Sequence, residues 1–138
     1  MKVLIKRLSQ TAKLPYHGTE ESAGWDLYAD RMEEKEDSFV YYTGIAVRLP
    51  KNHCGFIFPR SSVVKTGLFM GNSVGLLDRD YTGEISCVFY KRENAKPYQI
   101  GDRIAQLVVS PIPEVTFEEV AELPETSRGA GGYGSTGR

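Results

Sequence analysis

The sequence predicts an all-β fold, an antiparallel sandwich or barrel, from three observations. Short β-prone runs recur along the chain, and 14 glycines and 7 prolines separate them with turns. Helix-forming stretches are scarce. The 138 residues suit one domain, with enough chain to bury a hydrophobic core.

The expected strands follow runs that are rich in β-branched and aromatic residues. Residues 39–50 should hold two of them, divided by Thr43 and Gly44. The other expected strands are residues 2–8, 54–58, 85–91 and 103–110.

The remaining segments are expected to be loops, apart from one short helix. Residues 10–21 are polar and contain a proline and a glycine, and the charge run 33–37 indicates a loop in contact with water. Residues 61–66 could form the one helix, which Gly67 would end in a left-handed conformation.

Composition argues against several classes of function. The formal net charge of −1 gives no long-range attraction to nucleic acid or to an anionic membrane, so neither is an expected partner. No apolar run has the length of a membrane span, and the first residues do not resemble a signal peptide. We therefore expect a cytoplasmic protein, with a nucleus or a host cell also open. Cys54 and Cys87 lie in apolar surroundings without metal-ligand spacing, which predicts buried free thiols rather than a zinc site.

The C-terminal stretch differs in kind from the rest of the chain. Five of the eleven residues in 128–138 are glycine, so this stretch cannot hold one shape in water without a partner. The sequence thus predicts a domain over residues 1–127 and a flexible tail over 128–138. The tail is either a disordered end or a segment that wraps an anion and stacks on a flat group. The side chains available for the second role are Arg128, Tyr133, Ser135 and Thr136.

Residues 71–85 combine groups that could bind a small polar ligand. They indicate a hairpin whose bend exposes backbone N–H and C=O groups. Asp78 and Tyr81 lie three positions apart across the turn, so a carboxylate and an aromatic ring could face one guest. Acid-rich turns between strands usually serve only the turn, and this stretch alone is ambiguous.

Arg60, Ser61 and Ser62 follow an expected strand and begin the expected helix. Free amides and side-chain donors at such a position suit a phosphate. The alternative is a serine N-cap with Arg60 in a structural ion pair.

Two further stretches place polar side chains among apolar ones. Strand alternation puts Arg103 and Gln106 on opposite faces of residues 103–110. Gln106 could donate to a phosphate oxygen and Asp102 could brace an arginine, or the stretch is a plain core strand after a turn. Asp26 is flanked by bulky apolar residues, so it is either paired internally or directed at a cation.

Taken in order, five stretches resemble the five motifs of the trimeric deoxyuridine triphosphate nucleotidohydrolases (dUTPases), nearly from end to end. The matching stretches are residues 23–27, 59–62, 75–83, 101–106 and 128–137. The resemblance implies a jelly-roll-like distorted β-barrel (a dUTPase-like β-clip) with one short helix that assembles as a homotrimer. Each active site would take pieces from three chains, with the flexible tail of one closing as a lid over a site formed by the other two.

The resemblance also implies a reaction, in which dUTP and water give dUMP and pyrophosphate with Mg²⁺ on the triphosphate. This reaction would keep uracil out of DNA and supply dUMP for thymidylate synthesis. Asp78 resembles the carboxylate that holds the sugar 3′-hydroxyl and activates the attacking water. Tyr81 resembles the ring that excludes a 2′-hydroxyl, and Asp26 the acid that reaches Mg²⁺ through its water shell.

The other residues carried over from the resemblance would bind the base or the phosphates. The uracil-reading residues would be Asn72, Gly75, Leu76 and Leu77, the last three through their backbone. Phosphate oxygens would be held by Arg60, Ser61, Ser62 and Gln106. In the tail, the γ-phosphate would be bound by Arg128, Ser135 and Thr136, and the base would stack on Tyr133.

Two other functions fit the same fold. A dCTP deaminase needs a glutamate on the strand after the hairpin, and Val88 occupies the aligned position. A non-catalytic nucleotide-binding module would be expected to lack the carboxylate that Asp78 supplies. Three positions depart from the commoner family pattern without removing a required polar group, namely Trp25, Ser62 and Tyr133.

Overall fold

The structure is a computed structural model that describes residues 1–134. Its elements are β1 (Leu4–Arg7), β2 (Tyr16–His17), β3 (Trp25–Tyr28), β4 (Arg31–Glu34), β5 (Ser38–Tyr42), β6 (Ile45–Arg48), β7 (His53–Pro59), η1 (Ser61–Lys65), β8 (Leu68–Met70), β9 (Gly75–Leu77), β10 (Ser86–Lys91) and β11 (Arg103–Pro111). Within the described range, the 3₁₀ helix η1 is the only helix, and every strand pairing is antiparallel. No helix in this range is long and apolar enough to cross a bilayer. The all-β prediction is confirmed.

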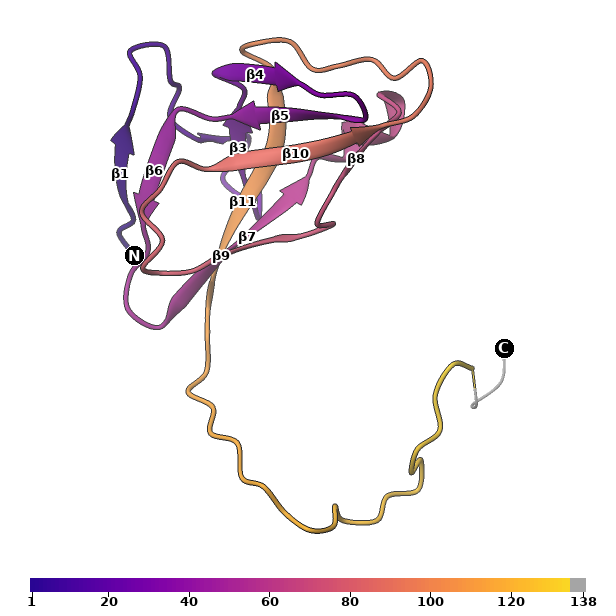
Figure 1. Cartoon of the computed structure of the whole chain (residues 1–138). Helices are drawn as coiled ribbons and strands as arrows, with labels where there is room; N and C mark the ends of the chain where they lie inside the picture. Colours follow the sequence, from indigo (N-terminus) through magenta and orange to yellow (C-terminus); the bar gives the residue numbers. More distant parts are fainter. Residues whose placement is uncertain (135–138) are drawn as a thin grey trace.

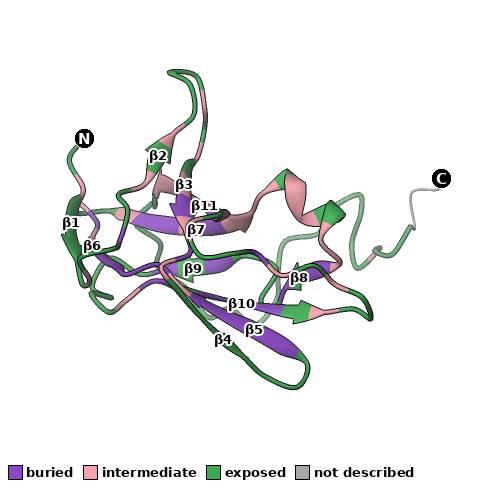
Figure 2. Cartoon of the chain, turned by 90° about the horizontal axis from the view of Figure 1, so that it is seen from above, coloured by how far each residue is buried: buried purple, intermediate pink, exposed green. Residues whose placement is uncertain are grey.

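The strands form two large sheets and one small one (Figure 1). The five-stranded sheet has the order β2-β3-β11-β7-β9, and the four-stranded sheet has the order β4-β5-β10-β8. β1 and β6 pair as a separate two-stranded sheet. Buried residues of both large sheets belong to one hydrophobic cluster, and the purple segments in Figure 2 lie on both layers. This packing of antiparallel layers agrees with the sandwich or barrel predicted from the sequence and with the jelly-roll-like barrel that the family resemblance implies.

An aromatic cluster fills the centre of the core. Tyr41 and Phe89 lie on neighbouring strands and are fully buried, with ring centroids 5.8 Å apart in an edge-on arrangement. Tyr98 packs edge-on against both rings, at 5.9 and 5.7 Å. The Tyr41 hydroxyl donates to the Tyr98 carbonyl oxygen at 3.2 Å, which satisfies a polar group in an apolar place. Burial raises the pKa of Tyr41 to about 12.

Most predicted elements are confirmed, with small shifts at their ends. Residues 39–50 contain β5 and β6, and the runs 54–58, 85–91 and 103–110 correspond to β7, β10 and β11. The predicted helix is η1, and Gly67 beyond it has a φ of 73°, as expected for a left-handed helix end. Both cysteines are buried and free.

Two predicted loops contain short strands. Residues 10–21 include β2, which pairs Tyr16 and His17 with β3 but is too short for its sequence to show alternation. Glu33 and Glu34 of the charge run belong to β4, which pairs with β5. β4 is an edge strand, and charged side chains on an edge discourage pairing with other chains. A charge run is therefore compatible with this strand.

Residues 71–85, here termed the crossing segment, do not form a hairpin with its own ladder. β8 precedes the segment and pairs with β10 in the four-stranded sheet. β9 lies within the segment and pairs with β7 in the five-stranded sheet. The chain thus leaves one sheet, adds an edge strand to the other and returns. The hairpin prediction is wrong because β8 and β9 have three residues each, too few for a pattern that assigns them to different sheets.

After β11 the chain leaves the sheets and runs outward (Figure 1). Every residue from 112 to 127, here termed the C-terminal arm, is exposed. Large apolar side chains are among them, with Phe117 98% and Leu123 82% exposed. The domain boundary at residue 127 and the flexible tail stay predictions.

We predict that Phe89→Ala lowers the free energy of unfolding by about 3–5 kcal/mol, because a cavity replaces a buried ring. Urea unfolding followed by circular dichroism measures the change. Val64→Ala, at a side chain that is 81% exposed, is the control and should change stability by less than about 0.5 kcal/mol. A loss below about 1 kcal/mol at Phe89 would contradict this description of the core.

Candidate functional site

Two strands of the five-stranded sheet, β3 and β11, and the residues that follow β7 line a polar pocket of about 330 Å³, here termed the arginine pocket. Asp26 lies on β3, Arg60 follows β7, and Gln106 lies on β11. β11 runs between β3 and β7, so side chains far apart in the sequence meet here. The lining residues are Gly18, Ser22, Ala23, Gly24, Asp26, Arg60, Ser61, Arg103 and Gln106.

Asp26 holds both arginines of the pocket. Its Oδ1 accepts a hydrogen bond from Arg60 Nε at 2.8 Å, and its Oδ2 accepts one from Arg103 Nη1 at 3.1 Å. The Asp26 side chain is only 14% exposed, so these bonds replace much of its lost hydration. Each guanidinium has five N–H donors and uses one of them here, so others can reach a ligand. Two cations against one carboxylate favour an anionic ligand.

A β-bulge brings Arg103 and Gln106 to the same pocket, so the prediction that they face opposite sides is wrong. The register of β11 against β3 shifts between Arg103 and Ala105. One extra residue in a strand reverses the alternation beyond it. Ile104 and Ala105 are accordingly both buried although they are adjacent. Gln106 Nε2 donates to the Pro59 carbonyl oxygen at 3.2 Å, which orients this side chain at the pocket wall.

Neighbouring residues have structural roles. The Asp102 carboxylate accepts from the Gln99 N–H at 2.7 Å and closes a turn, so it does not brace an arginine. Gly24 allows close packing, because a Cβ there would lie 2.8 Å from Gln106 Oε1. Ser62, in contrast to Ser61, does not line the arginine pocket.

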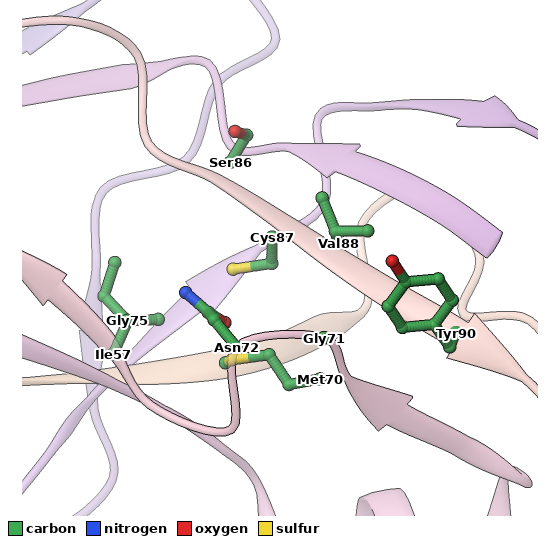
Figure 3. A pocket seen from close by; sticks show the side chains of 9 residues that line it. All are labelled: Ile57, Met70, Gly71, Asn72, Gly75, Ser86, Cys87, Val88 and Tyr90. Atoms are coloured by element: carbon green, nitrogen blue, oxygen red, sulfur yellow. The ribbon is translucent and has the colours of Figure 1, made fainter.

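The crossing segment and β10 line a second pocket of about 300 Å³, here termed the neutral pocket (Figure 3). A Cβ at Gly75 would lie 3.2 Å from Ile57 Cβ and 3.4 Å from Asn72 Nδ2, so glycine keeps this wall open. Burial raises the pKa of Cys87 to about 12, which keeps its thiol neutral. None of the lining residues is acidic or basic. They are Ile57, Met70, Gly71, Asn72, Gly75, Ser86, Cys87, Val88 and Tyr90.

β9 presents backbone groups beside the neutral pocket. It pairs with β7 on one side only and forms an edge of the five-stranded sheet. Backbone N–H and C=O groups on the other side therefore have no strand partner and can bind a ligand. Gly75 and Leu77 are buried, whereas Leu76 is 64% exposed. The residues expected to read a base thus lie on an open edge, next to Asn72.

Asp78 and Tyr81 follow β9 in a surface turn. The Tyr81 N–H donates to the Asp78 carbonyl oxygen at 3.3 Å, and the Tyr81 hydroxyl donates to the Glu84 carbonyl oxygen at 3.0 Å. Asp78 is exposed, and Tyr81 is 48% exposed. Neither residue lines the arginine pocket or the neutral pocket of its own chain.

The described part of the tail also lies outside both pockets. Arg128 Nε donates to the Gly131 carbonyl oxygen at 2.8 Å, and Tyr133 is fully exposed. Ser135 and Thr136 lie outside the described residues. Within one chain the predicted site residues that the structure describes therefore fall mainly into four separate groups: the arginine pocket, the neutral pocket with the β9 edge, the turn with Asp78 and Tyr81, and the tail.

Within residues 1–134, no group of three or more His, Cys, Asp or Glu side chains could hold a metal ion. Asp26 is the one carboxylate of the arginine pocket. Each of its oxygens accepts one hydrogen bond and has a lone pair left for another, such as one from a metal-bound water. Mg²⁺ keeps several waters and takes phosphate oxygens with few carboxylates. Asp26 thus fits an outer-shell role toward Mg²⁺ on a phosphate ligand.

Arg103 and Ser22 were missed as pocket residues by reasoning from the sequence. Arg103 could have been found from the sequence, because it is a basic residue at the start of a strand whose next residues are apolar. Its guanidinium also lies 5.6 Å from the Tyr16 ring centroid. No sequence pattern could have identified Ser22, because its position depends on the conformation of the loop between β2 and β3. In that loop the Ser22 Oγ accepts a hydrogen bond from the Thr19 N–H at 3.0 Å.

Comparison with known proteins identifies relatives across the whole chain. The sequence model of the dUTPase family matches residues 10–137. A protein of Coxiella burnetii named deoxyuridine 5′-triphosphate nucleotidohydrolase is 43% identical over 146 residues, which cover 100% of this chain and 95% of the relative. A protein of Hahella chejuensis with the same name is 41% identical over 144 residues, covering 99% and 95% of the two chains.

Solved structures agree with these relatives. The dUTPase of Staphylococcus bacteriophage 80alpha, solved with dUPNHPP, is 25% identical and has a TM-score of 0.85, with 99% of each chain covered. The dUTPase of phage phi11 of S. aureus, at 24% identity and a TM-score of 0.76 over 91% of this chain, supports the fold. The family model spans nearly all of the sequence, and the chain therefore belongs to the dUTPase family of hydrolases.

Proposed function

We propose that this protein hydrolyses dUTP to dUMP and pyrophosphate by attack of water on the α-phosphate, at sites that three copies share. The reaction would keep uracil out of DNA and supply dUMP for thymidylate synthesis. The observation that carries the proposal is the separation of the site groups in one chain. Asp78 lies at the surface outside the arginine pocket, and the tail lies outside both pockets. Copies packed together can complete what each chain lacks.

The arginine pocket suits the triphosphate. Guanidinium groups bind phosphate oxygens through paired N–H donors, and they spread the charge that develops on the leaving pyrophosphate. Asp26 orients Arg60 and Arg103 for this task. Further donors would come from Ser61 and Gln106 of the pocket, and from Arg128, Ser135 and Thr136 of the tail of another copy. Ser62, which lies outside the pocket in this structure, would have to turn toward the phosphates to add another donor.

Asp78 would be the general base. Its exposed carboxylate can approach a water and the sugar 3′-hydroxyl of a nucleotide that another copy holds by its phosphates. Holding the water in line with the α-phosphorus lowers the entropic part of the activation barrier, because the reacting atoms are already oriented. The Tyr81 ring would pack under the deoxyribose, where a 2′-hydroxyl would collide with it.

The neutral pocket and the open edge of β9 would read uracil. Asn72 and the backbone from Gly75 to Leu77 can pair with the amide-like edge of the base. A thymine methyl would clash with this tight bend, and cytosine reverses the donor and acceptor pattern. A mismatched edge leaves polar groups of the site unpaired, which makes the rejection strong.

Mg²⁺ bound to the triphosphate would supply charge neutralisation at the leaving pyrophosphate. Asp26 is the residue proposed to hold the water shell of this ion. Arg60 and Arg103 keep the Asp26 carboxylate oriented toward the pocket.

The C-terminal arm supports assembly with other copies. Val115, Phe117 and Leu123 are 61%, 98% and 82% exposed, and such apolar surface is usually covered by a partner. We propose a homotrimer in which each arm lies on a neighbouring copy. The tail follows the arm, so it could close over the site of another chain, with Tyr133 stacked on uracil.

Deamination of dCTP is not supported. Val88 lines the neutral pocket (Figure 3), and none of the lining residues carries a carboxylate. Proton transfer at the cytosine ring needs such a group. The pocket can hold a base but offers no acid to protonate it.

The test of this function is pyrophosphate release from dUTP, dCTP, dTTP and UTP at equal concentrations, with and without Mg²⁺. We expect rapid release from dUTP with Mg²⁺ and much slower release from the other three, because the base and sugar contacts reject them. Comparable rates for dUTP and dCTP, or release of ammonia from dCTP, would refute the proposed function.

We predict that Asp78→Asn keeps nucleotide affinity but lowers kcat for dUTP by about 10²–10⁴-fold, because the amide cannot take a proton from water. Steady-state kinetics and calorimetry with dUpNHpp measure the two effects. Glu93→Gln removes an exposed carboxylate outside both pockets and should leave kcat unchanged. Near-normal turnover of Asp78→Asn would remove Asp78 as the base.

A further inference from the structure

We propose that Glu84, held by Arg31 and by the Gly44 amide, is a positioning residue that sets the orientation of the Tyr81 ring and thereby the preference for deoxyribose over ribose. The inference rests on the proposed role of Tyr81 at the sugar. None of the five stretches that resemble the family motifs includes Arg31 or Glu84.

The Glu84 carboxylate accepts three hydrogen bonds, two from Arg31 and one from Gly44. Its Oε1 and Oε2 accept hydrogen bonds from Arg31 Nη1 and Nη2 at 2.9 and 2.8 Å, a two-pronged ion pair. Oε1 also accepts from the Gly44 N–H at 2.8 Å. The Glu84 side chain is 18% exposed, whereas that of Arg31 is 54% exposed. The carboxylate is thus anchored from the protein side as well as from the surface.

The anchor point at Gly44 is rigid. Gly44 has a φ of 66°, and a Cβ there would lie 2.7 Å from both Ala12 Cβ and Asp30 Oδ2, so only glycine fits. Its carbonyl oxygen accepts from the Leu8 N–H at 2.7 Å. The turn between β5 and β6 therefore offers Glu84 a fixed N–H donor.

The backbone next to Glu84 is bound to the same turn. Thr43 donates to the Ile85 carbonyl oxygen with its N–H at 3.0 Å and with its hydroxyl at 2.7 Å. The Ile85 N–H donates to the Ile45 carbonyl oxygen at 3.0 Å. Glu84 thus directly precedes Ile85, the residue at which the crossing segment is bound to the turn between β5 and β6.

Tyr81 takes its orientation from Glu84. Its hydroxyl donates to the Glu84 carbonyl oxygen at 3.0 Å, and a Cβ at Gly83 would lie 2.6 Å from the Tyr81 hydroxyl oxygen. The ring therefore folds over Gly83 toward Glu84. Among the described residues, the only other hydrogen bond made by Tyr81 is its N–H to Asp78 at 3.3 Å. Loss of the Glu84 anchor would leave the ring free to turn.

The Tyr42 ring holds Arg31 in place for its ion pair with Glu84. The Arg31 guanidinium carbon lies 3.9 Å from the Tyr42 ring centroid. The hydrogen bonds with Glu84 raise the pKa of Arg31 above its ordinary value, so the guanidinium stays charged. Ion pairs with an exposed partner contribute little to stability, so the main effect of this pair should be on geometry.

The experiment compares Glu84→Ala with Glu34→Ala. Glu34 lies on β4 with Arg31, and its Oε1 pairs with Lys91 Nζ at 2.8 Å, so Glu34→Ala removes a matched ion pair remote from Tyr81. The readout is the ratio of kcat/KM for dUTP to that for UTP. Glu84→Ala keeps the backbone carbonyl that Tyr81 binds but removes the three side-chain hydrogen bonds that hold this residue. We expect it to lower the ratio about three- to tenfold, the effect of losing the one hydrogen bond of the Tyr81 hydroxyl once its acceptor is free to shift, and Glu34→Ala to leave the ratio unchanged. A purely structural role would lower both kcat/KM values equally.

Second variants locate the cause. Tyr81→Phe keeps the ring without the hydroxyl and should lower the ratio as Glu84→Ala does. Glu84→Ala combined with Tyr81→Ala should be no less selective than Tyr81→Ala alone, since the anchor then has no ring to orient. Glu84→Gln retains an acceptor for Gly44 and should recover part of the selectivity, and it also serves if Glu84→Ala does not fold.

The outcomes separate this inference from the proposed function. A wild-type ratio in Glu84→Ala and Glu84→Gln, with a lowered ratio in Tyr81→Ala, would overturn the positioning role and leave the function intact. An unchanged ratio in Tyr81→Ala would overturn the sugar role of Tyr81 and this inference with it. Independently of activity, the ¹³C-tyrosine ring signal of Tyr81 should shift in Glu84→Ala without nucleotide. An unshifted signal would also overturn the positioning role.

Discussion

The site depends on one topological constraint, the passage of residues 71–85 from one sheet to the other. β8 and β10 are neighbours in the four-stranded sheet, and the chain between them detours to pair β9 with β7. The detour produces an open strand edge, a neutral pocket against β10 and a surface turn with Asp78. Its return point is fixed by the bonds of Ile85 to the turn between β5 and β6. A hairpin whose strands paired only with each other would not bring β9 to the five-stranded sheet.

The charges of the arginine pocket are positioned by a single carboxylate. Asp26 on β3 accepts hydrogen bonds from Arg103 on β11 and from Arg60, which follows β7. One carboxylate therefore links three neighbouring strands and orients two guanidinium groups. A protein with a net charge of −1 can attract a triphosphate in this way, because its positive groups are concentrated in one pocket. In the proposed positioning role, the ion pair of Glu84 and Arg31 would likewise hold the surface turn.

Most of the longer strands could be predicted from the sequence, and Asp26, Arg60, Ser61 and Gln106 were named before the structure placed them around one pocket. The arrangement of strands and side chains could not be predicted, and the roles of the named residues stay proposals. Composition and turn residues indicated β7, β10 and β11, and the ordered motifs pointed to Asp26, Arg60 and Asp78. The faces of Arg103 and Gln106 were mistaken because alternation assumes a regular strand, and β11 carries a bulge. The split of β8 and β9 between sheets depends on contacts with distant strands, which short runs do not encode. The Arg31–Glu84 pair joins residues 53 positions apart and belongs to no motif.

A site shared between copies is tested most directly by mixing two inactive chains. Asp78→Asn retains the tail, and a chain ending at residue 127 retains Asp78. After joint refolding, the tail of the first can close over the carboxylate of the second. We predict that dUTP hydrolysis returns in the mixture to a substantial fraction of the wild-type rate. A mixture that stays as inactive as each chain alone, with mixed oligomers demonstrated by native mass spectrometry, would contradict a site built from several chains.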